Sequence, residues 1–374
     1  MDMLAGKTVA VDASMAIYQF LIATQTFSAM GKPGVGELRD ADGNLTGHLV
    51  GIFHRTIQFF ENGIKPIWVF DGKPPEMKSK ELDKRKELKE KAEEERKEAE
   101  EKGDWERAKQ MAGRSIKITP EMMSDAKKLV KLMGACVIEA PCEAEAQCAE
   151  LVKMDLAFGT ATEDMDALTF GTKYLLRGFN SKKEPIVQID LKQVLEGFEM
   201  NQDEFIDLCV LCGCDYTHSI GGMGPVTAFK MLKDNGDIEG VLKKVQELNE
   251  DETKKKKYII PDNFLYEESR ELFKNPEVIR DKEVLEKQII FDKPNEEEMK
   301  QWLINDRGFA ESKVFNGLER LKKCSGKKNQ TRLDCFFKAG GMISSTQTKV
   351  QAPKGKMAGK GASAAAKKGR KSAM

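Results

Sequence analysis

The chain has 374 residues, of which 40% are hydrophobic and 33% charged, and its formal net charge is zero. Such a chain is long enough for one large core or two smaller ones, and it is too rich in apolar residues to be disordered throughout. Its charge is uneven, because nine Lys or Arg residues and no Asp or Glu follow Asp334. The remaining body is therefore acidic, which disfavours DNA binding by bulk charge unless bound cations offset clustered carboxylates.

The eight cysteines are interpreted as reduced thiols of an intracellular protein, because the sequence has no secretory signal and no long apolar segment. We therefore expect no membrane association. Cys209, Cys212, Cys214 and His218 faintly resemble a zinc site, but Cys209 lies within an apolar helix over 205–211 and no second Cys pair follows at zinc-site spacing. Small core residues are the preferred interpretation.

The first part of the chain alternates short β-branched runs with amphipathic segments. The predicted elements are a strand over 7–12, a helix over 15–23 capped by Ser14, a loop over 26–45, a helix over 47–61 and a strand over 65–71. A strand–helix–strand order of this length predicts a parallel sheet with right-handed crossovers.

Charges of both signs alternate from residue 76 to 110, where apolar residues are few. Glu87 with Lys91, and Glu93 with Lys97, have the i,i+4 spacing that supports a helix without a core. No heptad is sustained, which disfavours a coiled coil. We expect a helical insertion that projects from the sheet edge.

The second part continues the alternation and then becomes helical. The predicted elements are a helix over 121–132, a strand over 136–139, a helix from about 143 to 153, a strand that ends near 164, strands over 174–177 and 186–189, and helices over 201–212, 238–248, 296–304 and 311–321. The last three helices are expected to form a layer against the sheet. Residues 219–228 read as a helix-hairpin-helix-like unit, in which Gly222 and Gly224 let the backbone approach a phosphate, although an ordinary tight turn remains the alternative.

Carboxylates stand at the predicted strand ends and helix starts. They are Asp12, Asp71, Glu143, Glu145, Asp164, Asp166 and Asp215. Each pair alone also fits an acidic turn or a helix cap. In an open parallel sheet, however, these ends share one edge, and seven carboxylates there require cations. Oxygen ligands without a nearby His favour two Mg²⁺, or Mn²⁺, over Zn²⁺.

Two such ions, roughly 3.5–4 Å apart, activate water for phosphodiester hydrolysis. Lys78 and Arg85 lie on one helical face at the base of the insertion and could stabilise charge on a phosphate. Taken alone, the two residues would be assigned as ordinary surface cations.

Several motifs together resemble those of the flap endonuclease 1 family, structure-specific 5′ nucleases of replication and repair. The motifs are Val11-Asp12-Ala13-Ser14, Val69-Phe70-Asp71-Gly72-Lys73-Pro74-Pro75, Glu143-Ala144-Glu145-Ala146, Ala161-Thr162-Glu163-Asp164-Met165-Asp166 and Gly213-Cys214-Asp215-Tyr216. The resemblance implies a PIN-like α/β nuclease fold with a mainly parallel sheet, a helical arch, a hairpin unit that binds DNA, and endonuclease and 5′–3′ exonuclease activity with two Mg²⁺.

The resemblance also assigns residues. It implies that Asp12, Asp71, Glu143 and Glu145 bind the first metal ion and that Asp164, Asp166 and Asp215 bind the second, while Lys78 and Arg85 match the catalytic basic pair. The implied DNA contacts are Tyr18, Arg55, Glu143, Gly213, Asp215, Gly222 and Gly224. Gln330, Leu333, Phe336 and Phe337 resemble a box that binds the sliding clamp, proliferating cell nuclear antigen.

The implied organisation is a nuclease domain over 1–322 and a disordered tail over 323–374 that carries the box at 330–337 and a basic end. Within the domain lie an N-terminal nuclease region (about 1–85), the arch (about 76–118), an internal nuclease region (about 119–215) and the hairpin unit (about 213–235). We expect a monomer that acts on 5′-flap DNA in Okazaki fragment maturation and base excision repair, in the nucleus and also in mitochondria.

Three departures from the family pattern bear on this expectation. Six residues precede Lys7, where the family has an additional helix, and an abridged gene model is our preferred explanation. Gln25 replaces a usual DNA-contacting Arg, and Val226 and Thr227 replace basic residues. Two alternatives therefore stay open: a non-catalytic clamp-associated DNA-binding factor, and a related nuclease that acts on bubbles or junctions.

Overall fold

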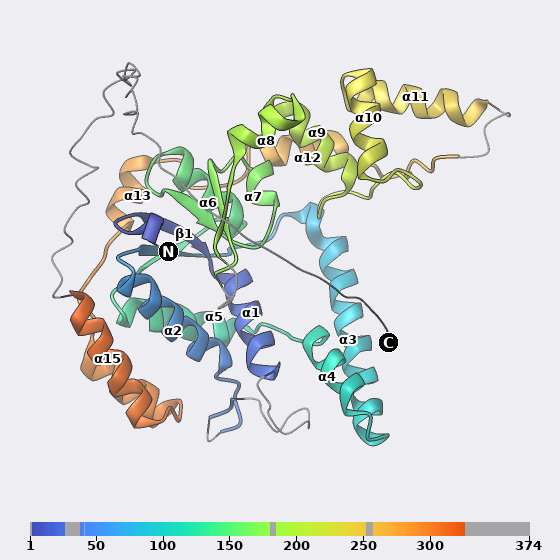
Figure 1. Ribbon diagram of the computed structural model, residues 1–374. Helices are drawn as coiled ribbons and strands as arrows, with labels where there is room; N and C mark the ends of the chain where they lie inside the picture. The colour runs from blue at the N-terminus through green and yellow to red at the C-terminus, as the bar shows by residue number, and fades with distance from the viewer. Residues whose placement is uncertain (1, 27–37, 41, 180–184, 252–256, 326–374) are drawn as a thin grey trace, which may run out of the picture. The chain divides into compact units, whose positions relative to one another are not determined.

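A computed structural model describes residues 2–26, 38–40, 42–179, 185–251 and 257–325 (Figure 1). The predicted clamp-binding box and basic tail lie outside these residues, as does most of the predicted loop over 26–45. None of the helices in the described residues is long and apolar enough to cross a membrane.

The centre of the described fold is a six-stranded sheet with the order β3-β2-β1-β4-β5-β6. Its strands are β1 (Thr8–Asp12), β2 (Lys65–Phe70), β3 (Cys136–Glu139), β4 (Gly159–Ala161), β5 (Tyr174–Arg177) and β6 (Val187–Asp190). Neighbouring strands are parallel except β6, which runs antiparallel to β5. The predicted mainly parallel sheet is confirmed, and the ends of β1, β2 and β4 share one edge.

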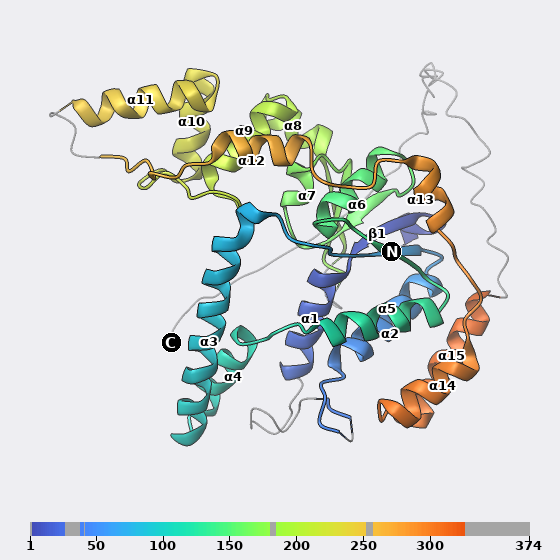
Figure 2. The ribbon, with the colours of Figure 1, turned by 180° about the vertical axis from the view of Figure 1, so that it is seen from behind.

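Helices cover both faces of the sheet because alternate strand residues point in opposite directions. Val9 and Val11 belong to a core with α1 (Ala13–Thr26), α2 (Gly47–Glu61), α5 (Pro120–Leu132), α14 (Glu296–Lys300) and α15 (Glu311–Ser325). Ala10 and Ile67 face the other way, toward α6 (Ala144–Lys153) and α13 (Lys282–Gln288). Figure 2 shows this arrangement from behind.

The charged insertion forms a hairpin of two helices rather than one coreless helix. After a short 3₁₀ turn (Glu76–Lys78), α3 (Ser79–Glu101) and α4 (Trp105–Arg114) lie side by side (Figures 1 and 2). Between them runs a narrow seam of small apolar side chains, in which Ala92, Ala99 and Ala108 are buried. Asp104 starts α4 by accepting a hydrogen bond from the Arg107 backbone N–H at 3.0 Å. The predicted helical insertion is confirmed, but the expectation that it lacks a core was wrong, because small residues suffice to bury this seam.

A separate core joins α9 (Gln202–Cys212), α10 (Pro225–Asn235), α11 (Ile238–Glu250) and α12 (Tyr266–Lys274). The expectation that residues 238–248 pack against the sheet was wrong, because Val241 and Val245 of α11 pack in this second core. The short helices α7 (Asp166–Thr169), α8 (Leu191–Phe198), α12 and α13 were not predicted. Beyond α14, residues 301–306 form a π-helix, and α15 extends past the predicted domain end at 322.

Candidate active site

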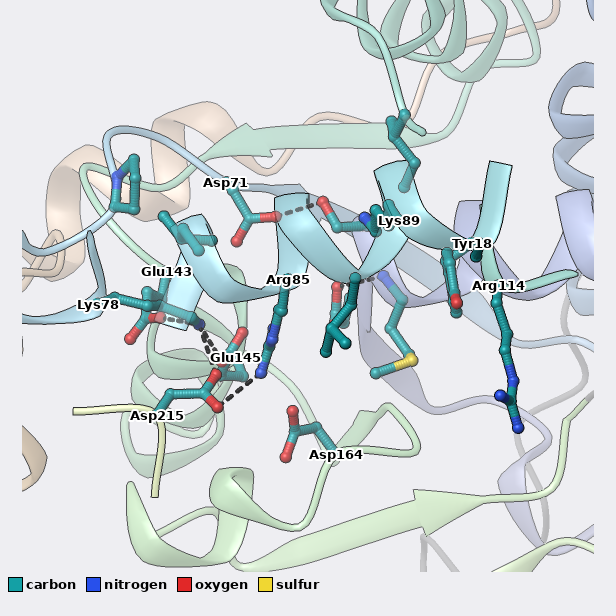
Figure 3. Close-up of a pocket in the computed structure, with 18 of the residues that line it drawn as sticks. Tyr18, Asp71, Lys78, Arg85, Lys89, Arg114, Glu143, Glu145, Asp164 and Asp215 are labelled. Carbon is teal, nitrogen blue, oxygen red and sulfur yellow. Dashed lines mark hydrogen bonds and ion pairs between the residues drawn. The ribbon is translucent and has the colours of Figure 1, made fainter. Parts of the chain in front are cut away.

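The predicted carboxylates come together at the sheet edge. A cavity of about 870 Å³ lies there, and the side chains that line it include Asp12, Asp71, Glu143, Glu145, Asp164 and Asp215 (Figure 3). Asp166 is set back from the cavity wall, where its backbone N–H donates to Asp164 Oδ1 at 3.0 Å. Lys78 and Arg85 line the same cavity from the base of the α3–α4 hairpin. Parallel strand topology thus unites residues that lie far apart in sequence.

Asp12 ends β1 and is held from two sides. Its Oδ1 accepts a hydrogen bond from the Met15 backbone N–H at 3.0 Å, and its Oδ2 accepts one from the Thr162 hydroxyl at 3.0 Å. Asp12 therefore caps the start of α1, and the prediction that Ser14 does so was wrong. The Ser14 hydroxyl instead donates to Asp71 Oδ2. Both acidic side chains are thus oriented by hydroxyl groups.

Asp71 is also fixed to the loop that follows β3. Its Oδ1 accepts a hydrogen bond from the Ala144 backbone N–H at 2.8 Å, at the start of α6. The next residue, Gly72, donates its N–H to the Cys142 carbonyl oxygen at 2.7 Å. A Cβ at Gly72 would lie 2.2 Å from the Ala140 carbonyl oxygen, so only glycine permits this approach. The loops after β2 and β3 are therefore locked together.

Lys78 joins the two predicted sets of metal ligands. Its Nζ pairs with Glu143 Oε1, lies 3.1 Å from Asp215 Oδ2 and lies 4.0 Å from Glu145 Oε1. Burial acts to lower the pKa of Lys78, but the charges of Glu145 and Glu143 outweigh it and raise that pKa. Arg85 pairs with Asp215 Oδ1 at 2.6 Å. Figure 3 shows both cations directed at this group of carboxylates.

The cations do not balance all of the negative charge. Burial, with a contribution from Asp71, raises the pKa of Asp12 to about 7. Burial and Asp164 raise the pKa of Asp166 to about 7, and burial and Asp12 raise the pKa of Glu145 well above its usual value. Further positive charge in the cavity would stabilise the ionised form of these buried carboxylates.

The donor chemistry of the cavity fits hard divalent cations, because the ligands are carboxylate oxygens. In the described residues, no three His, Cys, Asp or Glu side chains are already arranged to hold an ion, and Lys78 lies among the carboxylates. Lys78 and Arg85 are the cations paired with these carboxylates in this arrangement, and an ion bound by Glu143 and Asp215 would compete with Lys78.

The predicted DNA-contacting residues fall into three places. Tyr18, Glu143 and Asp215 line the cavity. Lys89 Nζ lies 6.0 Å from the ring centre of Tyr18. Arg55 lies outside the cavity, 5.7 Å from the ring centre of Phe20. The hairpin glycines form the third place and also lie outside the cavity. Gly213 (φ +112°) ends α9, Gly222 has φ +82°, and Gly224 precedes α10. The positive φ angles at Gly213 and Gly222 explain the choice of glycine at these two turns.

The cysteine interpretation is only partly right. The thiols of Cys209, Cys212 and Cys214 are free, and burial raises the pKa of each. Cys212, however, is exposed rather than part of the core. It is the last residue of α9, where the helix leaves the apolar cluster.

Sequence reasoning missed several residues of the site. Lys89 and Arg114 line the cavity beside Arg85, and Lys89 could have been found because it follows Arg85 by four residues on the same helix. Thr162 and Tyr216 gave no such signal. The Tyr216 hydroxyl donates to Glu143 Oε2, a partner 73 residues away in the chain.

Comparison with known proteins identifies the family and the fold. The XPG N-terminal domain matches residues 1–92, and the XPG I-region matches residues 134–215. Flap endonuclease 1-1 of Paramecium tetraurelia is 49% identical over 340 residues, which cover 90% of this chain and 86% of that protein. The chain belongs to the flap endonuclease 1 family. Members of this family are metal-dependent nucleases that act on DNA, and the predicted resemblance is confirmed.

Solved structures agree with this assignment. Flap endonuclease-1 of Methanococcus jannaschii aligns with a TM-score of 0.63 and 32% identity over 86% of this chain and 94% of that chain. The catalytic core of Rad2 in complex with a DNA substrate aligns with a TM-score of 0.62 and 26% identity, with the same coverage. The predicted PIN-like α/β nuclease fold is confirmed.

The raised pKa values predict that the metal-free protein loses stability as pH rises from 5 to 8. Asp12 and Asp166 have a pKa of about 7 in the fold, against 3.8 for a free side chain, so the folded chain holds more protons between these values. Its melting temperature, measured in EDTA by scanning fluorimetry, should therefore fall across this range. Divalent ions that bind these carboxylates would replace the protons, so saturating Mg²⁺ should flatten the dependence if Mg²⁺ binds there. Equal slopes with and without Mg²⁺ would contradict the reasoning.

Proposed function

We propose that this protein is a Mg²⁺-dependent 5′-flap endonuclease with 5′–3′ exonuclease activity. One observation carries the proposal. Six carboxylates from the ends of β1, β2 and β4 and the segments beside α6 and α9 line one cavity with Lys78 and Arg85 from the helical hairpin. Carboxylates can hold divalent ions, and the two cations beside them can bind a scissile phosphate.

In this proposal Asp12, Asp71, Glu143 and Glu145 hold one Mg²⁺, and Asp164, Asp166 and Asp215 hold the other, with Mn²⁺ as a substitute. The ions supply an activated water and charge neutralisation when bound. The chain itself orients the ligands through Ser14, Thr162 and the Ala144 N–H. Their fixed positions reduce the reorganisation that ion binding requires.

Lys78 and Arg85 are the catalytic cations of the proposal. Both pair with Asp215, at 3.1 and 2.6 Å. A phosphodiester in the cavity would give the two cations a new anionic partner. The carboxylates that they now contact would then be free to bind Mg²⁺. The two side chains then stabilise charge that develops on the phosphate oxygens.

The proposed substrate path runs under the α3–α4 hairpin. Tyr18 offers an aromatic face, while Lys89 and Arg114 line the cavity beyond Arg85 and can pair with phosphates of the flap. The glycine turns at Gly213, Gly222 and Gly224 are proposed to approach the backbone of the adjoining duplex, and Arg55 is proposed as a further DNA contact.

The cellular part of the proposal rests on sequence motifs. Residues 330–337 are proposed to bind the sliding clamp through Leu333, Phe336 and Phe337, with Gln330 at the start of the box. A monomer bound to the clamp would act in Okazaki fragment maturation and base excision repair. We propose the nucleus as its main location, with mitochondria as a second one.

The proposal is tested with a labelled 5′-flap duplex, incubated with the protein in Mg²⁺ and in EDTA. We expect cleavage at the flap junction in Mg²⁺ alone. Absence of any metal-dependent product would favour the non-catalytic DNA-binding alternative. Comparison of rates on flap, bubble and four-way-junction substrates separates the flap enzyme from a related junction nuclease, which would cleave flaps more slowly than junctions.

The helix-hairpin-helix-like unit over 219–228 predicts unusually weak binding of duplex DNA. Val226 is 71% exposed at the start of α10, where a cation would contact the DNA backbone. Val226→Lys should therefore tighten flap binding at low salt and steepen the slope of log K against log salt by about 0.9 per phosphate gained. Fluorescence anisotropy at several salt concentrations measures this slope. The matched control is Val187→Lys on β6, which is exposed outside the hairpin. Equal steepening by both variants would show a general charge effect.

A further inference from the structure

Glu143 has a different partner on each carboxylate oxygen. Oε1 pairs with Lys78 inside the cavity, and Oε2 accepts a hydrogen bond from the Tyr216 hydroxyl. Glu143 occupies the N-cap position of α6, yet its side chain makes no capping hydrogen bond to that helix. Its orientation is therefore set by Tyr216 and Lys78 rather than by α6.

Tyr216 is well placed to act as a fixed donor. The side chain is only 3% exposed, and its ring packs edge-on against Phe273 of α12, with 5.1 Å between ring centres. Its backbone lies in a tight turn closed by a bridge between Cys214 and Thr217. The Thr217 hydroxyl in turn accepts the Leu265 N–H at 2.9 Å, which ties the turn to the chain before α12. The phenol can therefore rotate little.

The two ends of this hydrogen bond belong to different parts of the site. Tyr216 directly follows Asp215, in the turn before the glycine hairpin, whereas Glu143 opens α6 after β3. The bond thus joins the segment of one proposed metal ligand to the side chain of another. Lys78 Nζ, which bridges the same two ligands, also lies 6.0 Å from the Tyr216 ring centre.

We propose that Tyr216 is a positioning residue for divalent-cation binding. By holding Oε2, its hydroxyl directs Oε1 of Glu143 toward the cavity and keeps that oxygen at a fixed distance from Asp215. The inference rests on the proposed function, because it takes Glu143 as a metal ligand. It goes beyond that function by assigning a role to a residue that does not line the cavity and is not one of the hairpin glycines.

The test is Tyr216→Phe in the full-length chain, because phenylalanine keeps the ring packing and removes only the hydroxyl. Mn²⁺ binding is measured by the electron paramagnetic resonance signal of free Mn²⁺, without DNA. We expect the dissociation constant for the tighter Mn²⁺ to rise about 10–100-fold, the usual loss when a hydrogen-bond partner of a metal ligand is removed. Flap cleavage should fall at low Mg²⁺ and recover at high Mg²⁺, with KM for DNA nearly unchanged.

Two further variants separate positioning from folding. Tyr266→Phe removes another tyrosine–glutamate hydrogen bond, to Glu267 at 3.1 Å, and should leave Mn²⁺ affinity unchanged. In a Glu143→Gln background, Tyr216→Phe should cause little additional loss of affinity, because both changes act through the same carboxylate. Thermal melts check that each variant is folded. If Tyr216→Phe lowers stability, the comparison of its effect in the wild-type and Glu143→Gln backgrounds still tests the positioning role.

Mn²⁺ affinity of Tyr216→Phe within twofold of wild type, or equal losses in the wild-type and Glu143→Gln backgrounds, would overturn the inference. That failure differs from failure of the proposed function. If wild-type protein binds Mn²⁺ and cuts flaps while Tyr216→Phe does the same, only the positioning role is lost. If wild-type protein neither binds Mn²⁺ nor cuts, the proposed function itself is wrong.

Discussion

Asp164→Asn is expected to lower flap cleavage by about three orders of magnitude or more, while the dissociation constant for flap DNA stays nearly unchanged. Asp164 is a proposed metal ligand, and loss of an anionic ligand removes several kcal/mol of transition-state stabilisation, where each 1.36 kcal/mol is tenfold in rate. Asparagine keeps an Oδ1 that can accept the Asp166 N–H, which now lies at 3.0 Å, so the loop after β4 should stay folded. Single-turnover cleavage and anisotropy binding measure the two effects separately.

The matched control for this variant is Asp155→Asn. Asp155 is an exposed residue with φ +60°, a conformation that asparagine tolerates, and it pairs with Lys173 outside the cavity. The Asp155→Asn variant removes the same charge and should cleave flaps at the wild-type rate. Asp164→Asn with cleavage near the wild-type rate would show that the second metal position is misassigned.

Lys78→Met should reduce the rate of cleavage by about 10²–10³-fold, the loss typical when one donor to a developing negative charge is removed. It should also destabilise the metal-free protein. Methionine keeps an unbranched side chain of four heavy atoms, but Glu143, Asp215 and Glu145 lose the ammonium group that lies among them. Unpaired carboxylates in a buried site repel one another.

These two effects should respond to Mg²⁺ in opposite ways. Saturating Mg²⁺ should restore the melting temperature of Lys78→Met, because the proposed ions would neutralise the carboxylates, but it should not restore cleavage. Lys80→Met is the control, since Lys80 is exposed two residues further on in α3. A Lys78→Met rate within about fivefold of wild type would contradict the catalytic role, since one lost donor costs 10²–10³-fold.

The sheet could be predicted from sequence because its strands carry strong local signals. Residues 67–70 are all β-branched or aromatic and are followed by Asp71, and the structure places β2 at Lys65–Phe70. Parallel order then dictated that Asp12, Asp71 and Asp164 share an edge. The convergence of the carboxylates followed from topology alone, before any side chain was placed.

Other features depend on contacts between distant segments and left no local pattern. The Glu143–Tyr216 hydrogen bond joins residues 73 positions apart in the chain. The Lys78–Asp215 ion pair joins residues 137 positions apart. Helix α8 is short, and no residue of it is fully buried. The division of the charged insertion into α3 and α4, by contrast, was marked by Gly103 and the capping residue Asp104, a helix-break signal that the charge pattern obscured.

The close approach at Gly72 has a consequence for how this site can diverge or be redesigned. Gly72 touches the backbone of the loop after β3 through Cys142, and Asp71 binds the Ala144 N–H in that same loop. An insertion or deletion in either loop would displace the cavity-lining carboxylates of both loops. The two loops should therefore change length only together, and a chimera that imports one loop from a distant nuclease would need to import its partner as well.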